Sequence, residues 1–309
     1  LPFLICMKQQ NWWEKTLLDK NPSFCSPIQE NISCEYLIIG GGVAGLHAAL
    51  RLIEEGKEVV LLEKTICGGS SSGKSSGFLT PDSELEVYQL IRRYGKKGAE
   101  EVWSIPVTGV EIVRSTAEKY KIDCDLEKQD SFFVGMGKKG KEAVEEETEA
   151  HHTMNLPCTS YTKESLPKVV GTSFYSAGIR TKDTFAINMM LYCYGLKNIL
   201  VKKGVRIFEH SEVLSLEGMN ASTKKGKVSA KKIIVCIDKM KKSLSTIGRK
   251  SYHAQTFLAI SKPVSKEQAQ SIFPDGKLMV WDSKLIYTYF RLTKDNRLLV
   301  GGGSVLTTY

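Results

Sequence analysis

The sequence lacks several of the patterns that assign a chain to a specialised class of protein. No apolar run approaches the ~20 residues that a membrane-spanning helix needs, so no membrane span is predicted. None of the eight cysteines forms a C-x-x-C pair and no secretory signal precedes them, which favours buried thiols in a reducing cytoplasm. Internal repeats and low-complexity linkers are absent too. The composition, 42% hydrophobic and 25% charged, is typical of a globular protein.

The chain has an excess of positive charge, but its basic residues are not arranged as in a nucleic-acid-binding protein. The net charge is +9, from 43 basic and 34 acidic residues, and much of the surplus is lysine in pairs such as Lys138-Lys139 and Lys224-Lys225. Nucleic-acid binding favours arginine and aromatic residues interleaved in one patch, which the sequence does not show. We therefore predict no nucleic-acid partner, and the charge serves solubility with some attraction for anionic ligands.

The length and the first residues bound the domain organisation. A chain of 309 residues suggests two domains or one large one. Residues 1–6 are apolar, but they are too short for a signal-peptide core and have no basic flank. Met7 follows directly, so a start of translation at Met7 is a hypothesis.

Residues 36–46 are the most informative segment. They form an apolar strand, a G-x-G-x-x-G turn and the start of an alanine-rich helix, and a second apolar run at 59–62 ends in Glu63. A strand before the glycines, a helix after them and an acid about 20 residues further on are what a dinucleotide-binding βαβ unit requires. A glycine turn in some other parallel α/β protein is the alternative.

Each residue type in this turn has a physical role in holding a dinucleotide. Gly40 lets the chain turn off the strand, Gly42 lets a pyrophosphate approach the backbone, and Gly45 lets the helix pack close to the sheet. The free N–H groups at the start of the helix hold the phosphates. Glu63 can accept hydrogen bonds from both hydroxyls of an adenosine ribose, and it would repel a 2′-phosphate, which argues against NADP.

The rest of the chain shows alternating helix and strand patterns. Residues 7–33 are expected to be an irregular arm. Helices are predicted over 83–94, 97–120, 138–150 and 184–203, the last of them ended by Gly204. Strands are predicted over 132–134, 205–208, 213–216, 232–236, 255–260, 278–281, 286–292 and 298–300.

A serine- and glycine-rich loop at 68–77 follows the second strand and helps to choose the cofactor. It offers many backbone N–H groups, several hydroxyls and one cation, Lys74, and such a loop could line a diphosphate and reach a flavin ring. A flexible surface loop is the alternative. Residues 301–303 are glycines after a strand, but no helix follows them. One nucleotide cofactor is therefore predicted.

These motifs give the chain a resemblance to the D-amino-acid-oxidase-like family of FAD-dependent oxidoreductases, from about Cys34 onward. The segments that carry it are 40–46, 62–63, 72–77, 122–125, 177–179, 232–235 and 290–299 followed by the three glycines. The resemblance implies an α/β fold with a Rossmann-like FAD-binding domain, as in glutathione-reductase-like two-domain flavoproteins, and an interleaved α+β substrate domain on a mainly antiparallel sheet. It implies FAD contacts at Gly40, Gly42, Val43, Ala44, Gly45, Glu63, Lys64, Ser72, Gly73, Lys74, Ser75, Ser76, Gly77 and Val213.

The sequence departs from the family pattern at three places. Lys74 stands where the family has arginine, which keeps the charge but loses the planar fork, and Ser76 replaces a glycine of the flavin loop. Residues 236–238 are larger than the small residues that the family places after this strand. The chain also stops at Tyr309, before the segment that closes over the flavin in the family. A truncated, non-catalytic flavin-fold fragment is therefore one alternative, and an NAD-dependent dehydrogenase is a further one.

The resemblance also implies a domain division and a reaction. We expect an N-terminal arm at 1–33, an FAD-binding domain at 34–80 and 160–250, and a substrate domain at 81–159 and 251–309. The implied reaction is oxidation of a C–N bond in an amine or amino acid, such as a gamma-glutamylputrescine-like compound. Hydride passes to the flavin, water hydrolyses the imine, and O2 reoxidises the flavin to give hydrogen peroxide.

Substrate contacts are predicted from one strand. Tyr287, Tyr289 and Arg291 alternate and so share a face, and two phenols with a guanidinium would suit a polar amine that bears a carboxylate. An exposed sheet face is the alternative. His151-His152 is interpreted as a surface pair rather than a metal site, and residues 123–125 as a turn rather than a carboxylate dyad. No residue is assigned as an obligatory base.

Overall fold

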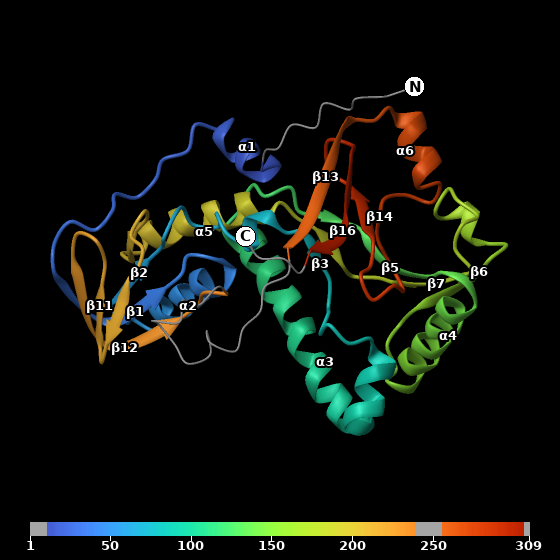
Figure 1. Cartoon of the computed structure of the whole chain (residues 1–309), viewed down its shortest axis with the longest axis horizontal. Coiled ribbons are helices and arrows are strands. Elements are labelled where there is room, and N and C mark those ends of the chain that lie inside the picture. Colours follow the sequence, from blue (N-terminus) through green and yellow to red (C-terminus); the bar gives the residue numbers. More distant parts are fainter. Residues whose placement is uncertain (1–10, 239–254, 306–309) are drawn as a thin grey trace. The chain divides into compact units, whose positions relative to one another are not determined.

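The computed structural model describes residues 11–238 and 255–305. They belong to two compact units, each discontinuous in sequence (Figure 1). The first unit comprises Leu1–Ser75, Ile122–Cys124 and Asn188–Tyr252, and the second comprises Ser76–Lys121, Asp125–Ile187 and His253–Tyr309. The hypothesis of a start at Met7 and the chain end at Tyr309 lie outside the described residues.

The first unit is built on a six-stranded sheet with the order β10-β11-β12-β1-β2-β9. Strand β1 pairs in parallel with β12 and β2, and β2 pairs in parallel with β9. Strands β10 and β11 form an antiparallel extension at one edge. The strands are β1 (Ile32–Ile39), β2 (Val59–Leu62), β9 (Arg206–Phe208), β10 (Ser215–Glu217), β11 (Asn220–Ser222) and β12 (Lys227–Val235).

In the described part of this unit, three helices accompany the sheet, namely α1 (Trp12–Leu18), α2 (Val43–Glu54) and α5 (Met189–Lys202). Helix α2 connects β1 to β2, so the predicted strand–turn–helix–strand unit is confirmed (Figure 1). All four residues of β2 are buried, which explains why its sequence is a continuous apolar run instead of an alternating one. Gly204 ends α5 with φ +96°, as predicted.

The expected irregular arm is partly helical. Asn11 caps α1 by accepting from the backbone N–H groups of Trp13 and Glu14, a side-chain cap of the kind that favours a helix start. Trp13 and Leu17 are buried, and the Trp13 indole donates to the backbone oxygen of Ser75 at 2.8 Å. The arm thus packs on the serine–glycine loop of its own unit.

The second unit has a seven-stranded sheet with the order β13-β16-β15-β14-β5-β7-β6. Only β14 and β5 pair in parallel, so this sheet is mainly antiparallel, as predicted. Its strands are β5 (Asp130–Gly135), β6 (Thr159–Thr162), β7 (Ala177–Thr181), β13 (Gln255–Pro263), β14 (Leu278–Asp282), β15 (Tyr289–Leu292) and β16 (Arg297–Val305). A small second sheet contains β3 (Phe78–Leu79), β8 (Phe185–Ala186) and β4 (Glu127–Lys128).

Helices α3 (Val87–Lys119), α4 (Gly137–Thr153) and α6 (Lys266–Ile272) complete the second unit. The two helices predicted over 83–94 and 97–120 are continuous except at Gly95, whose φ of 68° and ψ of 172° break the helical geometry. Among the described residues, no helix is both long and apolar enough to span a bilayer.

The division into units differs from the predicted domain boundaries at 160–187. These residues cluster with the second unit because β7 pairs with β5, and β6 pairs with β7. Residues 76–80 also belong to the second unit, and residues 122–124 to the first. The predicted helix at 184–203 begins only at Met189, since residues 185–186 form β8.

Candidate functional site

The glycine turn at the end of β1 has the geometry that its sequence predicts. Gly40 has φ +111°, a conformation that disfavours any side chain. A Cβ on Gly45 would lie 1.9 Å from the backbone oxygen of Gly40, so only glycine lets α2 start this close to the strand. A Cβ on Gly42 would meet only the hydroxyl of Ser72, at 3.0 Å. The turn therefore leaves a backbone surface that a diphosphate can approach.

The start of α2 supplies donors to the same place. Its cap residue, Gly42, has no side chain to satisfy the first N–H groups, and no acidic residue stands in the first turn. The N–H of Val43 donates to the hydroxyl of Ser72 at 3.1 Å, while Ala44 is exposed and Gly42 is half-buried. A helix start without a capping side chain, and without an acid in its own first turn, is suited to an anion.

Glu63 lies next to this turn, at the end of β2. The side chain is buried, and one carboxylate oxygen accepts the N–H of Gly41 at 2.7 Å. The other accepts the N–H of Thr65 at 2.7 Å and the Thr65 hydroxyl at 3.1 Å. These bonds hold the carboxylate against the turn, and its remaining lone pairs can accept from ribose hydroxyls. The contact with Thr65, two residues further along the chain, was not predicted from the sequence.

The serine–glycine loop folds against the turn through its backbone. The N–H of Gly68 donates to the oxygen of Gly41 at 2.9 Å, and the N–H of Gly73 donates to the oxygen of Gly68 at 2.8 Å. A Cβ on Gly73 would lie 2.3 Å from that same oxygen, so the loop closes only with glycine there. The 3-10 turn η1 (Ser72–Lys74) presents the Ser72 hydroxyl to α2, whereas the Lys74 side chain is exposed.

Residues after β12 meet the turn from the other side. A Cβ on Gly40 would lie 2.4 Å from the backbone oxygen of Cys236, and the N–H of Cys236 donates to the oxygen of Ile39 at 2.8 Å. The Ser71 hydroxyl donates to the carboxylate of Asp238. The larger residues that depart from the family pattern are thus accommodated by backbone contact and by one hydrogen bond.

Three other residues of this unit were predicted to contact FAD, namely Val213, Lys64 and Ser75, and their environments differ. Val213 is buried in the core beside the sheet, so it could reach a ligand only through its backbone. Lys64 is exposed and pairs with Glu212 at 3.4 Å. Ser75 uses its backbone oxygen to accept from Trp13.

Together these features make up a βαβ unit of the kind that holds the ADP half of a dinucleotide in oxidoreductases. The chemistry of the residues fits FAD, because glycine backbone, free helix N–H groups and a hydroxyl would meet its diphosphate and a carboxylate its ribose. The comparison with known sequences gives the family. Residues 35–308 match the family described as FAD dependent oxidoreductase, DAO, and the chain belongs to this family. Its cofactor is FAD.

Several characterised or named proteins are similar to the chain. It is 30% identical over 288 residues to a probable oxidoreductase, OrdL, of Haemophilus influenzae, and 29% identical over 287 residues to the gamma-glutamylputrescine oxidoreductase of Escherichia coli. Both alignments cover 90% of the chain, and they cover 67% and 66% of those proteins. The chain thus spans about two thirds of the length of these relatives.

The fold agrees with solved flavoenzyme structures. The crystal structure of glycine oxidase from Geobacillus kaustophilus superposes with a TM-score of 0.73 and 15% sequence identity, over 90% of this chain and 73% of that one. The likeness confirms the predicted α/β fold, with one parallel sheet region and one mainly antiparallel sheet.

The second unit brings the end of the serine–glycine loop against Arg291. The guanidinium is buried and donates to the backbone oxygens of Ser76 at 2.8 Å, Ile187 at 3.3 Å and Leu292 at 3.3 Å. Burial lowers the pKa of Arg291 to about 10. Arg291 was predicted to face a substrate carboxylate. Its carbonyl partners instead indicate a structural role, in which the guanidinium holds the loop at 76–77 in place.

The two tyrosines lie differently from Arg291. Tyr287 lies before the first residue of β15, and its side chain is 40% exposed. The strand predicted over 286–292 is therefore shorter, and only Tyr289 and Arg291 alternate within it. The Tyr289 ring lies 5.8 Å from that of Tyr287 and meets Phe78 edge-on at 5.9 Å. Burial raises the pKa of both phenols. Both tyrosines therefore remain candidates for substrate contact.

We expect Arg291→Lys to destabilise the second unit. A lysine ammonium keeps the charge, but it cannot reproduce the planar fork that reaches three carbonyl oxygens. Carbonyl oxygens that stay buried without a donor should lower the free energy of unfolding by about 2 kcal/mol. Unfolding in denaturant measures this loss. Arg93→Lys, on the exposed side of α3, is the control and should change little. Equal stability of the two variants would contradict the role given to Arg291.

The sequence predicted a surface pair at His151-His152 and a turn at 123–125, and the first prediction is wrong for His151. His151 is buried, with Nε2 3.2 Å from the carboxylate of Glu147, while His152 is exposed. The helical register of α4 turns the first histidine inward and the second outward. Asp123 and Asp125 pair with different lysines, Lys20 and Lys294, so they form no dyad. Among the described residues, no cluster suited to a metal ion occurs.

Proposed function

We propose that the chain is an FAD-dependent oxidase that acts on the C–N bond of an amine or amino acid. The observation that carries the proposal is the turn at 40–45 with the carboxylate of Glu63 beside it, which together make the ADP half of a flavin site. The type of bond is supported by two similar proteins, whose names are gamma-glutamylputrescine oxidoreductase and glycine oxidase. The family assignment favours FAD over the alternative of an NAD-dependent dehydrogenase.

The residues of the first unit bind and orient the cofactor. Backbone at Gly42 and the N–H groups at the start of α2 hold the diphosphate, and Glu63 holds the adenosine ribose. The Ser72 hydroxyl, which accepts from Val43, can turn to donate to a phosphate oxygen. When bound, FAD supplies the acceptor for the hydride that leaves the substrate carbon. No protein base is required if the amine arrives neutral.

Amine oxidation is tested by flavin bleaching and peroxide release. The purified protein, supplied with FAD, should absorb at about 450 nm, and a substrate amine should bleach this band without oxygen. On admission of O2, one molecule of hydrogen peroxide should appear for each molecule of amine oxidised. We expect gamma-glutamylputrescine to be a better substrate than putrescine, sarcosine or glycine.

Two outcomes would contradict different parts of the proposal. If gamma-glutamylputrescine releases no more peroxide than putrescine, sarcosine or glycine, the substrate is wrong while the reaction type stands. If none of these amines bleaches a bound flavin, the proposed oxidation of C–N bonds is wrong. If the folded chain does not retain FAD at all, the alternative of a non-catalytic flavin-fold fragment stands.

A further inference from the structure

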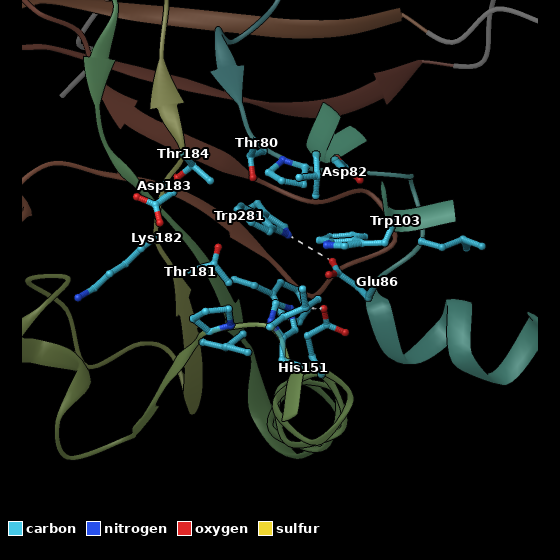
Figure 2. Close-up of a pocket in the computed structure, with 18 residues that line it drawn as sticks. Thr80, Asp82, Glu86, Trp103, His151, Thr181, Lys182, Asp183, Thr184 and Trp281 are labelled. Carbon is cyan, nitrogen blue, oxygen red and sulfur yellow. Dashed lines mark hydrogen bonds and ion pairs between the residues drawn. The ribbon is translucent and has the colours of Figure 1, made fainter. Parts of the chain in front are cut away.

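A cavity of about 250 Å³ lies within the second unit, between the face of the large sheet and helices α3 and α4 (Figure 2). Its volume is below the ~300–1,000 Å³ of pockets for drug-sized ligands, so it suits a small molecule and not a dinucleotide. Trp281 of β14 and Trp103 of α3 provide aromatic walls, and Glu86, Glu147 and His151 provide polar groups. Of these residues, only His151 was among those with a role predicted from the sequence.

The imidazole of His151 has one ring nitrogen without a protein partner. Nε2 lies 3.2 Å from Glu147, whose two oxygens also accept the N–H groups of Val87 and Tyr88 at the start of α3. Because a carboxylate in this role only accepts, Nε2 carries the proton and Nδ1 is an acceptor in the neutral ring. In the described part of the chain, Nδ1 is buried and has no hydrogen-bond partner. A buried acceptor of this kind is costly unless a ligand donates to it.

Glu86 adds a second acceptor to the cavity. One of its oxygens accepts from the indole nitrogen of Trp281 at 3.3 Å (Figure 2). Burial, together with the nearby charge of Glu147, raises the pKa of Glu86 to about 8. A positively charged group in the cavity would offset both effects and favour the carboxylate form.

Acidic residues outnumber basic ones around the cavity, in contrast to the chain as a whole. Asp82, Glu86 and Glu147 contribute carboxylates, while the protein has a net charge of +9. Asp183 is exposed and pairs with Lys128 at 3.0 Å. Lys182 is exposed, and its side chain extends away from the other labelled residues (Figure 2). The indole rings of Trp103 and Trp281 can attract a cation through their faces.

We propose that this cavity binds a protonated aliphatic amine, with the Glu86 carboxylate as its counter-ion and Nδ1 of His151 as an acceptor. The amine lies between the indole rings of Trp103 and Trp281. Binding is a property of the second unit alone. The proposal of a cation site does not depend on the oxidase function. The further step, that the bound amine is the substrate that the flavin oxidises, rests on the proposed function.

Calorimetric titration with putrescine tests the site in the full chain with FAD. Its neutral counterpart, 1,4-butanediol, has the same chain length and should bind at least about tenfold more weakly, since it cannot form an ion pair with the half-buried Glu86 carboxylate. The variant Glu86→Gln keeps the shape of the side chain and should weaken putrescine binding at least about tenfold. Glu84→Gln, at an exposed acid two residues away, is the matched control and should bind as the wild type does.

A second pair of variants tests the aromatic wall. Trp103→Phe keeps a ring face and should retain most of the affinity for putrescine. Trp103→Leu should bind putrescine about threefold more weakly than Trp103→Phe. Circular dichroism checks that each variant is folded. The proposal is wrong if the diol binds as tightly as putrescine, or if Glu86→Gln binds as tightly as Glu84→Gln.

The two proposals fail in different ways. If putrescine binds through Glu86 but no amine bleaches the flavin, the oxidase function is wrong and the cation site stands. If amines bleach the flavin while Glu86→Gln leaves putrescine affinity and the KM for amines unchanged, the site is wrong and the oxidase function stands.

Discussion

The variant Gly42→Ala should fold normally and bind FAD about tenfold to a hundredfold more weakly, because its methyl group projects from the backbone surface that the diphosphate approaches. The new Cβ meets no backbone, only the Ser72 hydroxyl at 3.0 Å, which can rotate away. Gly45→Ala would not separate the two effects, because its Cβ would lie 1.9 Å from a backbone oxygen and disturb the fold itself. Fluorescence titration with FAD measures the change in affinity.

The matched control for this prediction is Gly109→Ala. Gly109 lies in α3, a Cβ there meets nothing within 4 Å, and its φ is not positive. Alanine at an exposed helical position should leave FAD affinity unchanged and raise stability by about 0.5–1 kcal/mol. If Gly42→Ala binds FAD as tightly as Gly109→Ala, the diphosphate does not lie at the start of α2.

Glu63→Gln should lower both stability and FAD affinity. The carboxylate accepts the N–H groups of Gly41 and Thr65, one with each oxygen. A glutamine turns one of these acceptors into a donor, which leaves a buried N–H facing another N–H and should cost about 2 kcal/mol of unfolding free energy. The charge-assisted bonds to the ribose are lost as well, which should weaken FAD binding by a further tenfold or so.

Two measurements separate these effects. Denaturant unfolding without FAD gives the loss of stability, and the FAD titration gives the loss of affinity. Glu55→Gln, at an exposed acid that pairs with Arg51 on the surface of α2, is the control and should change neither quantity appreciably. If Glu63→Gln is less stable but binds FAD like the control, Glu63 supports the turn and does not hold the ribose.

Local patterns predicted the first unit well. The strand, glycine turn, helix and acid at 36–63 are set by short-range steric and packing rules, so their positions follow from spacing alone. Strand β11 (Asn220–Ser222) was missed, because its three residues carry no apolar pattern and pair only through β10 and β12. The helix at Trp12–Leu18 was missed because its buried face is defined by the loop that Trp13 contacts, which is distant in sequence.

The features that the sequence did not predict depend on contacts between residues that are distant in the chain. Arg291 alternates with two tyrosines, and alternation predicts a shared face, but not that carbonyl oxygens from Ser76 and Ile187 surround the guanidinium. The cavity beside Glu86 is formed by residues from β14, α3 and α4 that are spread over some two hundred positions of the chain. Only the burial of His151, on the inward face of α4, could have been suspected from helical periodicity.

Parallel titrations of the purified protein with FAD and FMN test the central claim most directly. If the turn at 40–45 and Glu63 hold the ADP half of the cofactor, FAD should bind saturably with one molecule per chain. FMN, which lacks that half, should bind at least about a hundredfold more weakly. Equal affinity for FAD and FMN, or no binding of FAD to a chain whose circular dichroism shows it to be folded, would contradict this account.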